Sequence, residues 1–378
     1  MSYTPSARIG EICGLGAIAH IDTAALTHNL SRVRALAPRS RVLAVVKADA
    51  YGHGLLDVAR ALQAADGFAV ARLSEATRLR ADGISQRIVL LAGVHDAEEL
   101  AMAAQLDIDV VVHHATQVEM LEQASLGLRV NAWLKVDSGM HRLGLPPAVV
   151  AEAHARLLRC PAVKEPLRVM THLADADDPH KDVTNKQIEA VRECTSQLDV
   201  ELSIGNSAGI MAWPGARSDW VRPGIMLYGV SPFANDSGID HDLRPAMTLT
   251  SRVMAINEVV EGAHIGYGGT YAAPKAMSVG AIAAGYADGY PRHVPSGTSI
   301  LVDRVPVPIA GRVSMDTVTV DLRAQQNAKV GSHAVLWGDG LPVEGVARAA
   351  GTIGYELLSR VGSRVPRIMQ RHCWPNDG

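Results

Sequence analysis

The chain has 378 residues, more than one compact domain usually contains, so its length predicts about two domains. Its 36 Lys and Arg against 39 Asp and Glu give a net charge of −3, and aromatic residues make up only 4%. This balance excludes a nucleic-acid binder that works through massed positive charge, and it argues against a sheet that stacks RNA bases on aromatic side chains.

The four cysteines, Cys13, Cys160, Cys194 and Cys373, lie far apart. Their spacing matches neither a disulfide framework nor a zinc site, and it is typical of a reducing compartment. The N-terminal residues contain no basic segment followed by a sustained apolar run, so we expect neither a secretory signal nor a membrane span. We therefore predict a cytoplasmic protein that binds neither nucleic acid nor membrane.

Up to about residue 230, short apolar runs alternate with longer segments of helical periodicity. The runs are continuously apolar, which indicates burial on both faces, as in a parallel sheet covered by helices. Eight such repeats predict an α/β fold with a (β/α)8 TIM-like barrel, which we place at residues 12–240. The eight expected strands are 42–46, 68–71, 88–91, 109–112, 130–136, 167–171, 201–204 and 220–227.

A different pattern follows the barrel. Residues 231–245 have no hydrophobic period and are rich in Pro, Gly, Asn and Asp, which is typical of a linker. Further on, "TVTVDL" predicts an alternating strand, and the prolines of "VPVPI" restrict that run to an edge strand. We predict a mostly β C-terminal domain over residues 241–378, joined by an N-terminal strand at 1–11 and containing one helix near "PVEGVARAAG".

Barrel enzymes carry their chemistry on the loops at the carboxyl ends of the strands, because those loops converge on one rim. In this sequence these positions hold several cations and hydrogen-bond donors, which predicts an anionic ligand. They are Lys47, Lys135, Arg142, His172, Asn206, Ser207 and Arg222.

Lys47 is the most informative of these residues. It follows the apolar run "LAVV", where loss of hydration lowers the pKa of an ammonium group and favours the neutral amine that Schiff-base chemistry needs. The alternative is a lysine whose stem lies along the strand end while its charge reaches water. The glycines of "YGHG" and "RPGI" allow backbone N–H groups to approach a phosphate. A reactive lysine beside a phosphate site is what pyridoxal 5'-phosphate requires.

Seven motifs in order make the sequence resemble the alanine racemases, fold-type III pyridoxal-phosphate enzymes built from a barrel and a β domain. They are "AVVKADAYGHG", "KVDSGMHRLG", "VRPGIMLYG", "IGYGGTY", "AAGYADGYPR", "GRVSMD" and "TIGYELLSRVGSRVPR". The resemblance covers nearly the whole chain. It implies an isomerase that interconverts L-alanine and D-alanine by a two-base mechanism, either supplying D-alanine for peptidoglycan or degrading alanine.

By this resemblance, Lys47 and Tyr267 are the two catalytic bases on opposite faces of the cofactor, and Lys47 also holds the cofactor covalently. A phenol is a weak base at neutral pH, so Tyr267 is expected to need cationic neighbours. His172 and Arg222 are the candidates. An isolated tyrosine in a strand would otherwise be read as a cross-strand packing residue.

The resemblance also assigns the groups around the cofactor. Arg222 would face the pyridine nitrogen, where it donates a hydrogen bond but no proton, so the cofactor is a weaker electron sink. Arg142 would lie beside the phenolic oxygen and the substrate. Lys135 matches a lysine that is carbamylated in some members, with a bound anion or a shifted pKa as the alternatives. The remaining expected cofactor contacts are Tyr51, His172, Asn206, Ser207, Gly224, Ile225 and Tyr355.

From the second domain, Tyr286 is expected to line the path of the substrate, and Met315 to offer its backbone N–H to the substrate carboxylate. Together with Tyr267 they would reach the site from the partner subunit of a head-to-tail homodimer, so that the active site is shared. Asp316 is expected to brace this wall, unless it only caps a turn.

Two positions depart from the family pattern: Asp49 stands where many members have Asn, and Gly205 where Ala is common. No H-x-x-x-H pair has a carboxylate partner, so we expect no catalytic metal. Three other functions remain open. They are a broader racemase acting on Ser, Lys or Arg, a fold-type III decarboxylase (which usually has an acid where Arg222 stands), and a non-catalytic pyridoxal-phosphate carrier, which would not need Tyr267.

Overall fold

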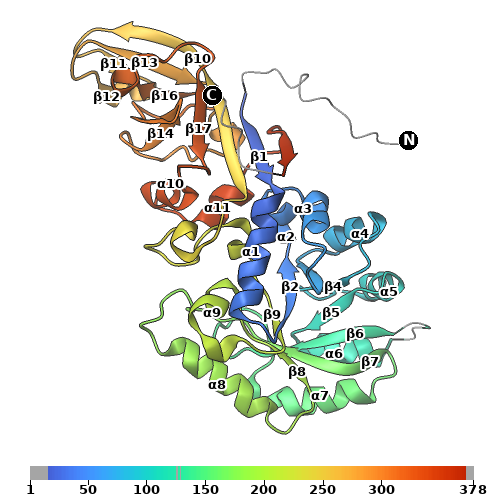
Figure 1. The fold of residues 1–378 in the computed structure, drawn as a ribbon. Coiled ribbons are helices and arrows are strands. Elements are labelled where there is room, and N and C mark those ends of the chain that lie inside the picture. Colours follow the sequence, from blue (N-terminus) through green and yellow to red (C-terminus); the bar gives the residue numbers. More distant parts are fainter. Residues whose placement is uncertain (1–15, 125–126, 128, 372–378) are drawn as a thin grey trace. The chain divides into compact units, whose positions relative to one another are not determined.

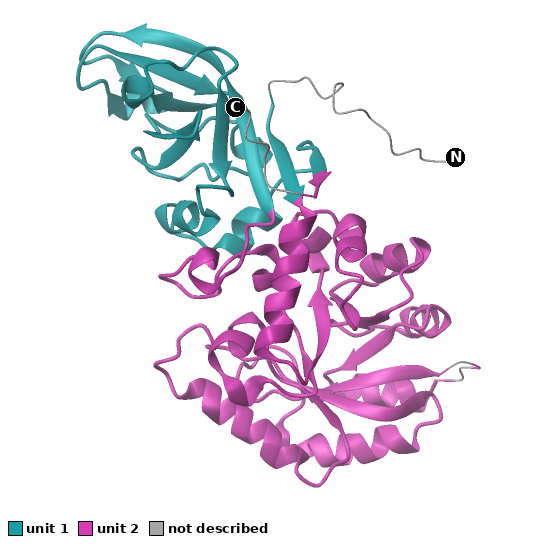
Figure 2. Cartoon of the chain, in the orientation of Figure 1, with its two compact units in different colours: residues 1–21, 247–368 teal, residues 22–246, 369–378 magenta. Residues whose placement is uncertain are grey.

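The computed structural model describes residues 16–124, 127 and 129–371, and the chain divides into two compact units (Figure 2). One unit, magenta in Figure 2, runs from 22 to 246 and includes residues 369–371. The other comprises residues 247–368 together with the N-terminal residues up to 21. Cys13, Cys373 and the strand expected at 1–11 lie outside the described residues.

Residues 22–246 form the predicted barrel (Figure 1). Each strand pairs in parallel with the next, and the last pairs with the first through Arg41↔Trp220 and Val42↔Val221, which closes the barrel. The fold class predicted from eight continuously apolar runs is therefore confirmed. The strands are β2(Arg41–Val45), β3(Gly67–Val70), β4(Arg87–Leu90), β5(Asp109–Val112), β6(Val130–Lys135), β7(Val163–Met170), β8(Glu201–Ser203) and β9(Trp220–Val221).

Helices follow the strands and cover the outside of the barrel (Figure 1). Among the described residues, none of the helices combines the length and the apolar composition needed to cross a bilayer. The carboxylate of Asp22 caps the first helix by accepting hydrogen bonds from the N–H groups of Ala24 and Ala25. The helices are α1(Thr23–Leu36), α2(Lys47–Tyr51), α3(Leu55–Ala61), α4(Leu73–Ala81), α5(Ala97–Gln105), α6(Ala115–Glu122), α7(Val150–Arg159), α8(Val183–Thr195) and α9(Ser207–Ala212), with 3-10 turns η1(Pro147–Val149) and η2(Pro214–Ala216).

The last expected strand, 220–227, is wrong over most of its length. β9 ends at Val221, and the 3-10 turn η3(Ile225–Tyr228) takes the rest of the run. Pro223 has no N–H to donate to a ladder, which ends the strand. The side chains of η3 are fully buried, so this segment is as continuously apolar in sequence as a buried strand. The expected linker at 231–245 also contains a 3-10 turn, η4(Gly238–His241).

The second unit is built on an eight-stranded sheet in the order β15-β14-β17-β10-β1-β18, with β13 paired to β10 and to β16. β15 lies at the edge, as its prolines predict. The strands are β1(Ile18–Asp22), β10(Met247–Val259), β13(Met277–Ile282), β14(Ser299–Val302), β15(Val305–Pro308), β16(Val318–Asp321), β17(His333–Trp337) and β18(Arg367–Gln370), with a separate pair β11(His264–Ile265) and β12(Tyr271–Ala272).

In its described residues this unit has two α-helices where the sequence predicted one. α10(Val343–Ala349) lies at the expected place, and α11(Gly354–Ser359) follows it. Gly351, at φ +66°, separates the two helices, and α11 has only 6 residues, too few to show a helical period. The unit also contains the 3-10 turns η5(Tyr267–Gly269), η6(Tyr286–Asp288) and η7(Leu322–Ala324).

Candidate active site

The carboxyl ends of the barrel strands bring the predicted polar residues to one rim. Lys47 lies two residues beyond β2, Lys135 is the last residue of β6, and His172 follows β7. Asn206 and Ser207 follow β8, and Arg222 follows β9 directly. Strands that are distant in the sequence therefore deliver cations and hydroxyls to the same place.

The short segment α2, which begins at Lys47, is a left-handed turn and not a regular α-helix. Ala48, Asp49, Ala50 and Tyr51 all have φ between +53° and +56°, although none of them is glycine. Hydrogen bonds from Ala50 N to Val46 O and from Gly52 N to Ala48 O close the turn at 2.9 and 3.0 Å. This conformation costs an L-residue about 1–2 kcal/mol, so the surrounding structure must hold the turn.

The amine of Lys47 is half-buried, and burial lowers its pKa, with a further lowering by the nearby Arg142. The carboxylate of Glu75 acts in the opposite direction on the same pKa. The net shift favours the neutral amine, which is the form that attacks a carbonyl group.

Lys135 lies in a group of positive charges. Burial, together with Arg222, Arg142 and Lys47, lowers its pKa to about 8. Burial and the same cations hold the pKa of His172 far below its usual value, so this imidazole is neutral at physiological pH. Positive charges that lie close together on one rim repel one another, so each destabilises the charged form of its neighbours. An anionic group bound among them would be stabilised.

The loop after β6 doubles back and carries Arg142. Leu145 N donates to Lys135 O at 2.8 Å, and the carboxylate of Asp137 accepts the N–H groups of Gly139 and His141. Gly144, at φ +134°, is needed here because a Cβ would lie 2.4 Å from Asp137 N. Arg142 itself is exposed at the tip of this loop.

Arg222 is 4% exposed and is held from several sides. Its Nη1 donates to Ser203 O at 2.7 Å and to Ser203 Oγ at 2.6 Å, and its Nη2 donates to Thr171 O and to Ile204 O. Burial lowers the pKa of Arg222 to about 10, so it stays a cation at neutral pH. These bonds fix the plane of the guanidinium with one edge tied to the backbone.

Ser207, Gly224 and Tyr51 form a cup between β8 and β9. Ser207 Oγ accepts the N–H groups of Gly224 at 2.9 Å and Met226 at 3.3 Å. A Cβ on Gly224 would lie 2.5 Å from the hydroxyl of Tyr51, so glycine is needed for this close approach. Burial raises the pKa of Tyr51, which therefore keeps its hydroxyl proton. Asn206 caps α9 by accepting the N–H of Gly209 at 2.9 Å, and Ile225, at the start of η3, is fully buried.

Four predicted site residues belong to the other unit and are described within it. Tyr267 is at the tip of the hairpin between β11 and β12, and 70% of its side chain is exposed. Gly266, Gly268 and Gly269 around it all have positive φ, which gives this tip its shape. Tyr355 is half-buried in the first turn of α11.

Tyr286 and Met315 lie on two turns that are joined directly. Tyr286 N donates to Ser314 O, and Ala287 N donates to Met315 O, both at 3.0 Å. The exposed fraction of Met315 is 53%. Gly285 is required at this junction because a Cβ would lie 2.3 Å from Met315 O.

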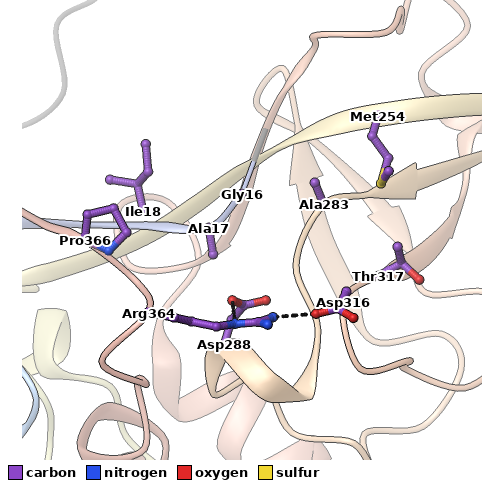
Figure 3. A pocket seen from close by; sticks show the side chains of 10 residues that line it. All are labelled: Gly16, Ala17, Ile18, Met254, Ala283, Asp288, Asp316, Thr317, Arg364 and Pro366. Carbon is purple, nitrogen blue, oxygen red and sulfur yellow. Dashed lines mark hydrogen bonds and ion pairs between the residues drawn. The ribbon is translucent and has the colours of Figure 1, made fainter. Parts of the chain in front are cut away.

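Arg364 ties the same two turns with its side chain (Figure 3). Its Nε donates to Asp288 Oδ1 at 2.7 Å, and its Nη2 donates to Asp316 Oδ1 at 2.8 Å. Asp288 in turn accepts the N–H of Gly285. The three charged residues line a cavity of about 450 Å³ in this unit (Figure 3).

Sequence reasoning missed three residues that support these positions: Glu75, Tyr228 and Arg364. Glu75 accepts hydrogen bonds from three backbone N–H groups, one of them that of Ala48. Tyr228 stacks on Tyr51 with ring centroids 4.7 Å apart. Its hydroxyl donates to Val45 O at 2.9 Å. A Glu in the first turn of a helix is a capping signal that could have indicated Glu75. Tyr228 and Arg364 gave no signal beyond lying in a recognised motif.

Known proteins match this chain along most of its length. The alanine racemase N-terminal domain family matches residues 21–232, and the alanine racemase C-terminal domain family matches residues 246–369. An alanine racemase of Nitrosococcus oceani is 53% identical over 350 residues, which is 93% of this chain and 98% of that protein. A Shewanella alanine racemase is 49% identical over 347 residues, covering 92% and 97% of the two chains.

Solved structures give the same result. The crystal structure of the biosynthetic alanine racemase from Pseudomonas aeruginosa matches with a TM-score of 0.91 and 46% identity, covering 94% of this chain and all of the other. The alanine racemase from Acinetobacter baumannii matches with a TM-score of 0.90 and 38% identity over 94% of this chain and all of the other. These matches confirm the resemblance carried by the seven motifs and the isomerase class that it implied. The chain belongs to the alanine racemase family.

Proposed function

We propose that this chain interconverts L-alanine and D-alanine with pyridoxal 5'-phosphate as its cofactor. The observation that carries the proposal is the position of Lys47: its amine has a lowered pKa and lies on the same rim as the hydroxyl and N–H groups of the Ser207–Gly224 cup. The names of the relatives support alanine as the substrate.

The residues at the rim fit this cofactor. A phosphate needs hydrogen-bond donors at a place where the backbone can approach closely. Tyr51 and Ser207 supply hydroxyl groups, and glycine at position 224, whose N–H donates to Ser207, leaves room beside them. A ring nitrogen needs a fixed donor. Nη1 and Nη2 of Arg222 donate to Ser203, Thr171 and Ile204, so we assign Nε to this role. Tyr355 and His172 would complete the contacts.

Pyridoxal phosphate, when bound, supplies an electron sink that makes the α-proton of an amino acid acidic. Lys47 would hold the cofactor covalently, and its freed amine would take or return the proton on one face. The phenol of Tyr267 would do so on the other face. Arg222 remains a cation that donates without releasing a proton, since its pKa of about 10 lies well above neutral pH. This favours racemisation over side reactions that need a stronger electron sink.

The second base, Tyr267, would come from a second copy of the chain, together with Tyr286 and Met315. The exposure of Tyr267 and Met315 in the single chain supports this, because a base that acts in a shielded site must be covered by another surface. Arg142 would bind the substrate, and Met315 would offer its backbone N–H to the substrate carboxylate. The proposed enzyme is therefore a homodimer with shared active sites.

Lys135 is proposed to carry a carbamate. This modification needs a neutral amine and carbon dioxide. The pKa of about 8 leaves roughly a tenth of the amine neutral at pH 7, far more than the ordinary value of 10.5 would leave. The resulting anion would offset the surrounding cations, Arg142 and Arg222 among them.

Borohydride reduction of the cofactor-loaded protein, followed by peptide mapping, tests the proposal. The label is expected on Lys47, and a label elsewhere would overturn the assignment. Optical rotation with alanine, serine, lysine and arginine then tests the substrate. Comparable turnover of all four would favour a broad racemase, and release of carbon dioxide would favour a decarboxylase.

A further inference from the structure

We propose that Glu75 is a positioning residue whose carboxylate holds the left-handed turn after Lys47 and thereby holds the Lys47 amine in its working geometry. The inference deepens the proposed function and rests on it. Neither the seven motifs nor the family matches assign a role to Glu75.

The turn needs a restraint from outside. Its four left-handed residues are L-amino acids, and this conformation is disfavoured for all of them. At its far end, the carboxylate of Asp49 accepts the N–H of Leu55 at 3.0 Å, and Asp49 O accepts the N–H of Gly54 at 2.9 Å. These bonds hold the end of the turn that is farther from Lys47. The end next to Lys47 needs a separate contact.

Glu75 supplies that contact. It lies in the first turn of α4, after β3, and its Oε1 accepts the N–H of Ala48 at 2.6 Å. Its Oε2 accepts the N–H groups of Ala71 and Arg72 at 2.9 and 3.0 Å. One carboxylate thus ties the residue after Lys47 to the backbone that leaves the neighbouring strand β3, which pairs with β2.

All three partners of Glu75 are donors, so the site requires two accepting oxygens. In a Glu75→Gln variant, one of these positions becomes an NH2 group that faces a backbone N–H. If the remaining oxygen stays on Ala71 and Arg72, Ala48 loses its acceptor. The turn then loses its restraint next to the reactive lysine.

Glu75 also acts on Lys47 through its charge. Arg142 lowers the pKa of Lys47, which also interacts electrostatically with Lys135 and His172, and Glu75 is the acid whose charge raises that pKa. Removing this negative charge is expected to lower that pKa further. A role in folding alone would not move the pH profile in this direction.

The test compares Glu75→Gln, Glu75→Asp and the control Glu99→Gln in the full-length protein. Glu99 is a close match, because it also lies in the first turn of a barrel helix and accepts a loop N–H, that of His95 at 2.9 Å. Amide hydrogen exchange without cofactor, the Kd of pyridoxal phosphate and the pH dependence of kcat are measured, with thermal unfolding as the check on folding.

Glu75→Gln is expected to speed exchange in the peptide that spans Lys47 to Gly54, to weaken cofactor binding by about tenfold, and to move the acid limb of kcat to lower pH. Glu75→Asp keeps the charge and is expected to keep the pH profile while losing the restraint. Glu99→Gln should change exchange only near His95. The inference is overturned if Glu75→Gln and Glu99→Gln behave alike in exchange, Kd and pH profile. If borohydride does not label Lys47 in the wild type, the proposed function fails instead, and the exchange data still decide whether Glu75 holds the turn.

Discussion

The hydroxyl of Ser207 accepts a hydrogen bond from the backbone N–H of Gly224 at 2.9 Å, although the two residues are 17 positions apart. Because Met226 N also donates to this oxygen, the hydroxyl proton of Ser207 can be directed to an acceptor outside the pair. The β8 end and the turn after β9 thus combine into one donor group.

Ser207→Ala removes this proton and is expected to weaken the binding of pyridoxal phosphate by roughly 10- to 100-fold, since a hydrogen bond to a charged group contributes about 1.5–3 kcal/mol. Equilibrium dialysis against the cofactor measures the change. The control is Ser40→Ala, which likewise removes a buried serine hydroxyl, in this case one that donates to the carbonyl of Ser218. Equal affinities of the two variants for pyridoxal phosphate would contradict a role of Ser207 in binding its phosphate.

Tyr267→Phe removes the phenol that is proposed as the second base. Racemisation is expected to fall by roughly 10²- to 10⁴-fold, as is usual for loss of a general base, with solvent exchange of the α-proton lost mainly from L-alanine. A Lys47 substitution should instead suppress exchange from D-alanine. Tyr271→Phe is the matched control, because Tyr271 lies in the same hairpin and its hydroxyl bonds to Asp321. Wild-type exchange in both directions for Tyr267→Phe would exclude the two-base scheme.

Lys135 is expected to gain the mass of one carbon dioxide, and the modified fraction should rise with pH from about 6 to about 9 in bicarbonate. The pKa of about 8 sets this window, because only the neutral amine reacts. Carbon-13 bicarbonate and NMR detect the carbamate, and Lys135→Met should abolish the signal. Lys164, which pairs with Asp107 through a 2.8 Å hydrogen bond, is the position for comparison. A carbamate signal that survives in Lys135→Met would place the modification elsewhere.

The unmodified form of Lys135 also predicts a stability trend. Its folded pKa of about 8 lies below the unfolded value of 10.5, so the unfolded chain binds the extra proton between these values. Stability should therefore rise with pH over this interval when bicarbonate is absent, and it should be reduced below about pH 8. Thermal unfolding of the wild type and Lys135→Met, compared across this range, measures the difference. If the melting temperatures of the two proteins change with pH in parallel, Lys135 does not cause the stability trend.

Glu201→Gln is expected to destabilise the barrel by about 1–3 kcal/mol at neutral pH, because the carboxylate pairs with Arg41 and with the buried Arg168. Burial raises the pKa of Glu201, but hydrogen bonds from Arg41, Trp220 and Arg168 outweigh this and lower it to about 2. The stabilisation is therefore present above the unfolded pKa of 4.5 and lost as the pH falls towards 2. The difference in melting temperature between wild type and variant should shrink over that range.

Glu122→Gln provides the comparison, since Glu122 also pairs with an arginine, accepting two hydrogen bonds from Arg156 in a more exposed position. It should change the melting temperature little at any pH. If both variants lose the same stability, the buried pair of Glu201 and Arg168 stabilises the barrel no more than an exposed ion pair does.

Arg364→Ala breaks the link between the turns that carry Tyr286 and Met315. We expect kcat/KM for alanine to fall by roughly 10- to 100-fold through misplacement of these residues, while the Kd of the cofactor stays near the wild-type value. Arg360→Ala is a nearby control, because Arg360 pairs only locally with Glu356 at 3.2 Å. An unchanged kcat/KM in Arg364→Ala would show that backbone bonds alone hold the turns.

The sequence by itself determined the barrel, the edge strand and the position of several polar residues at strand ends. Short, continuously apolar runs such as 109–112 are typical of parallel strands buried on both faces. A polar residue that follows such a run in a barrel lies at the rim. The same reasoning failed for 220–227, because the buried side chains of a 3-10 turn are as apolar as those of a strand. It also missed α11, which is shorter than two helical turns.

Only the tertiary structure decided how the site residues are held. Glu75 reaches Ala48 across 27 positions, Arg364 reaches Asp288 across 76, and Arg222 is fixed by the carbonyls of Thr171 and Ile204. Such bonds join elements that meet only when each unit has folded, and a single acceptor or donor leaves no periodic pattern in a sequence. Periodicity reports which face of an element is buried, whereas the contacts that restrain Lys47 and Arg222 depend on which strand ends become neighbours.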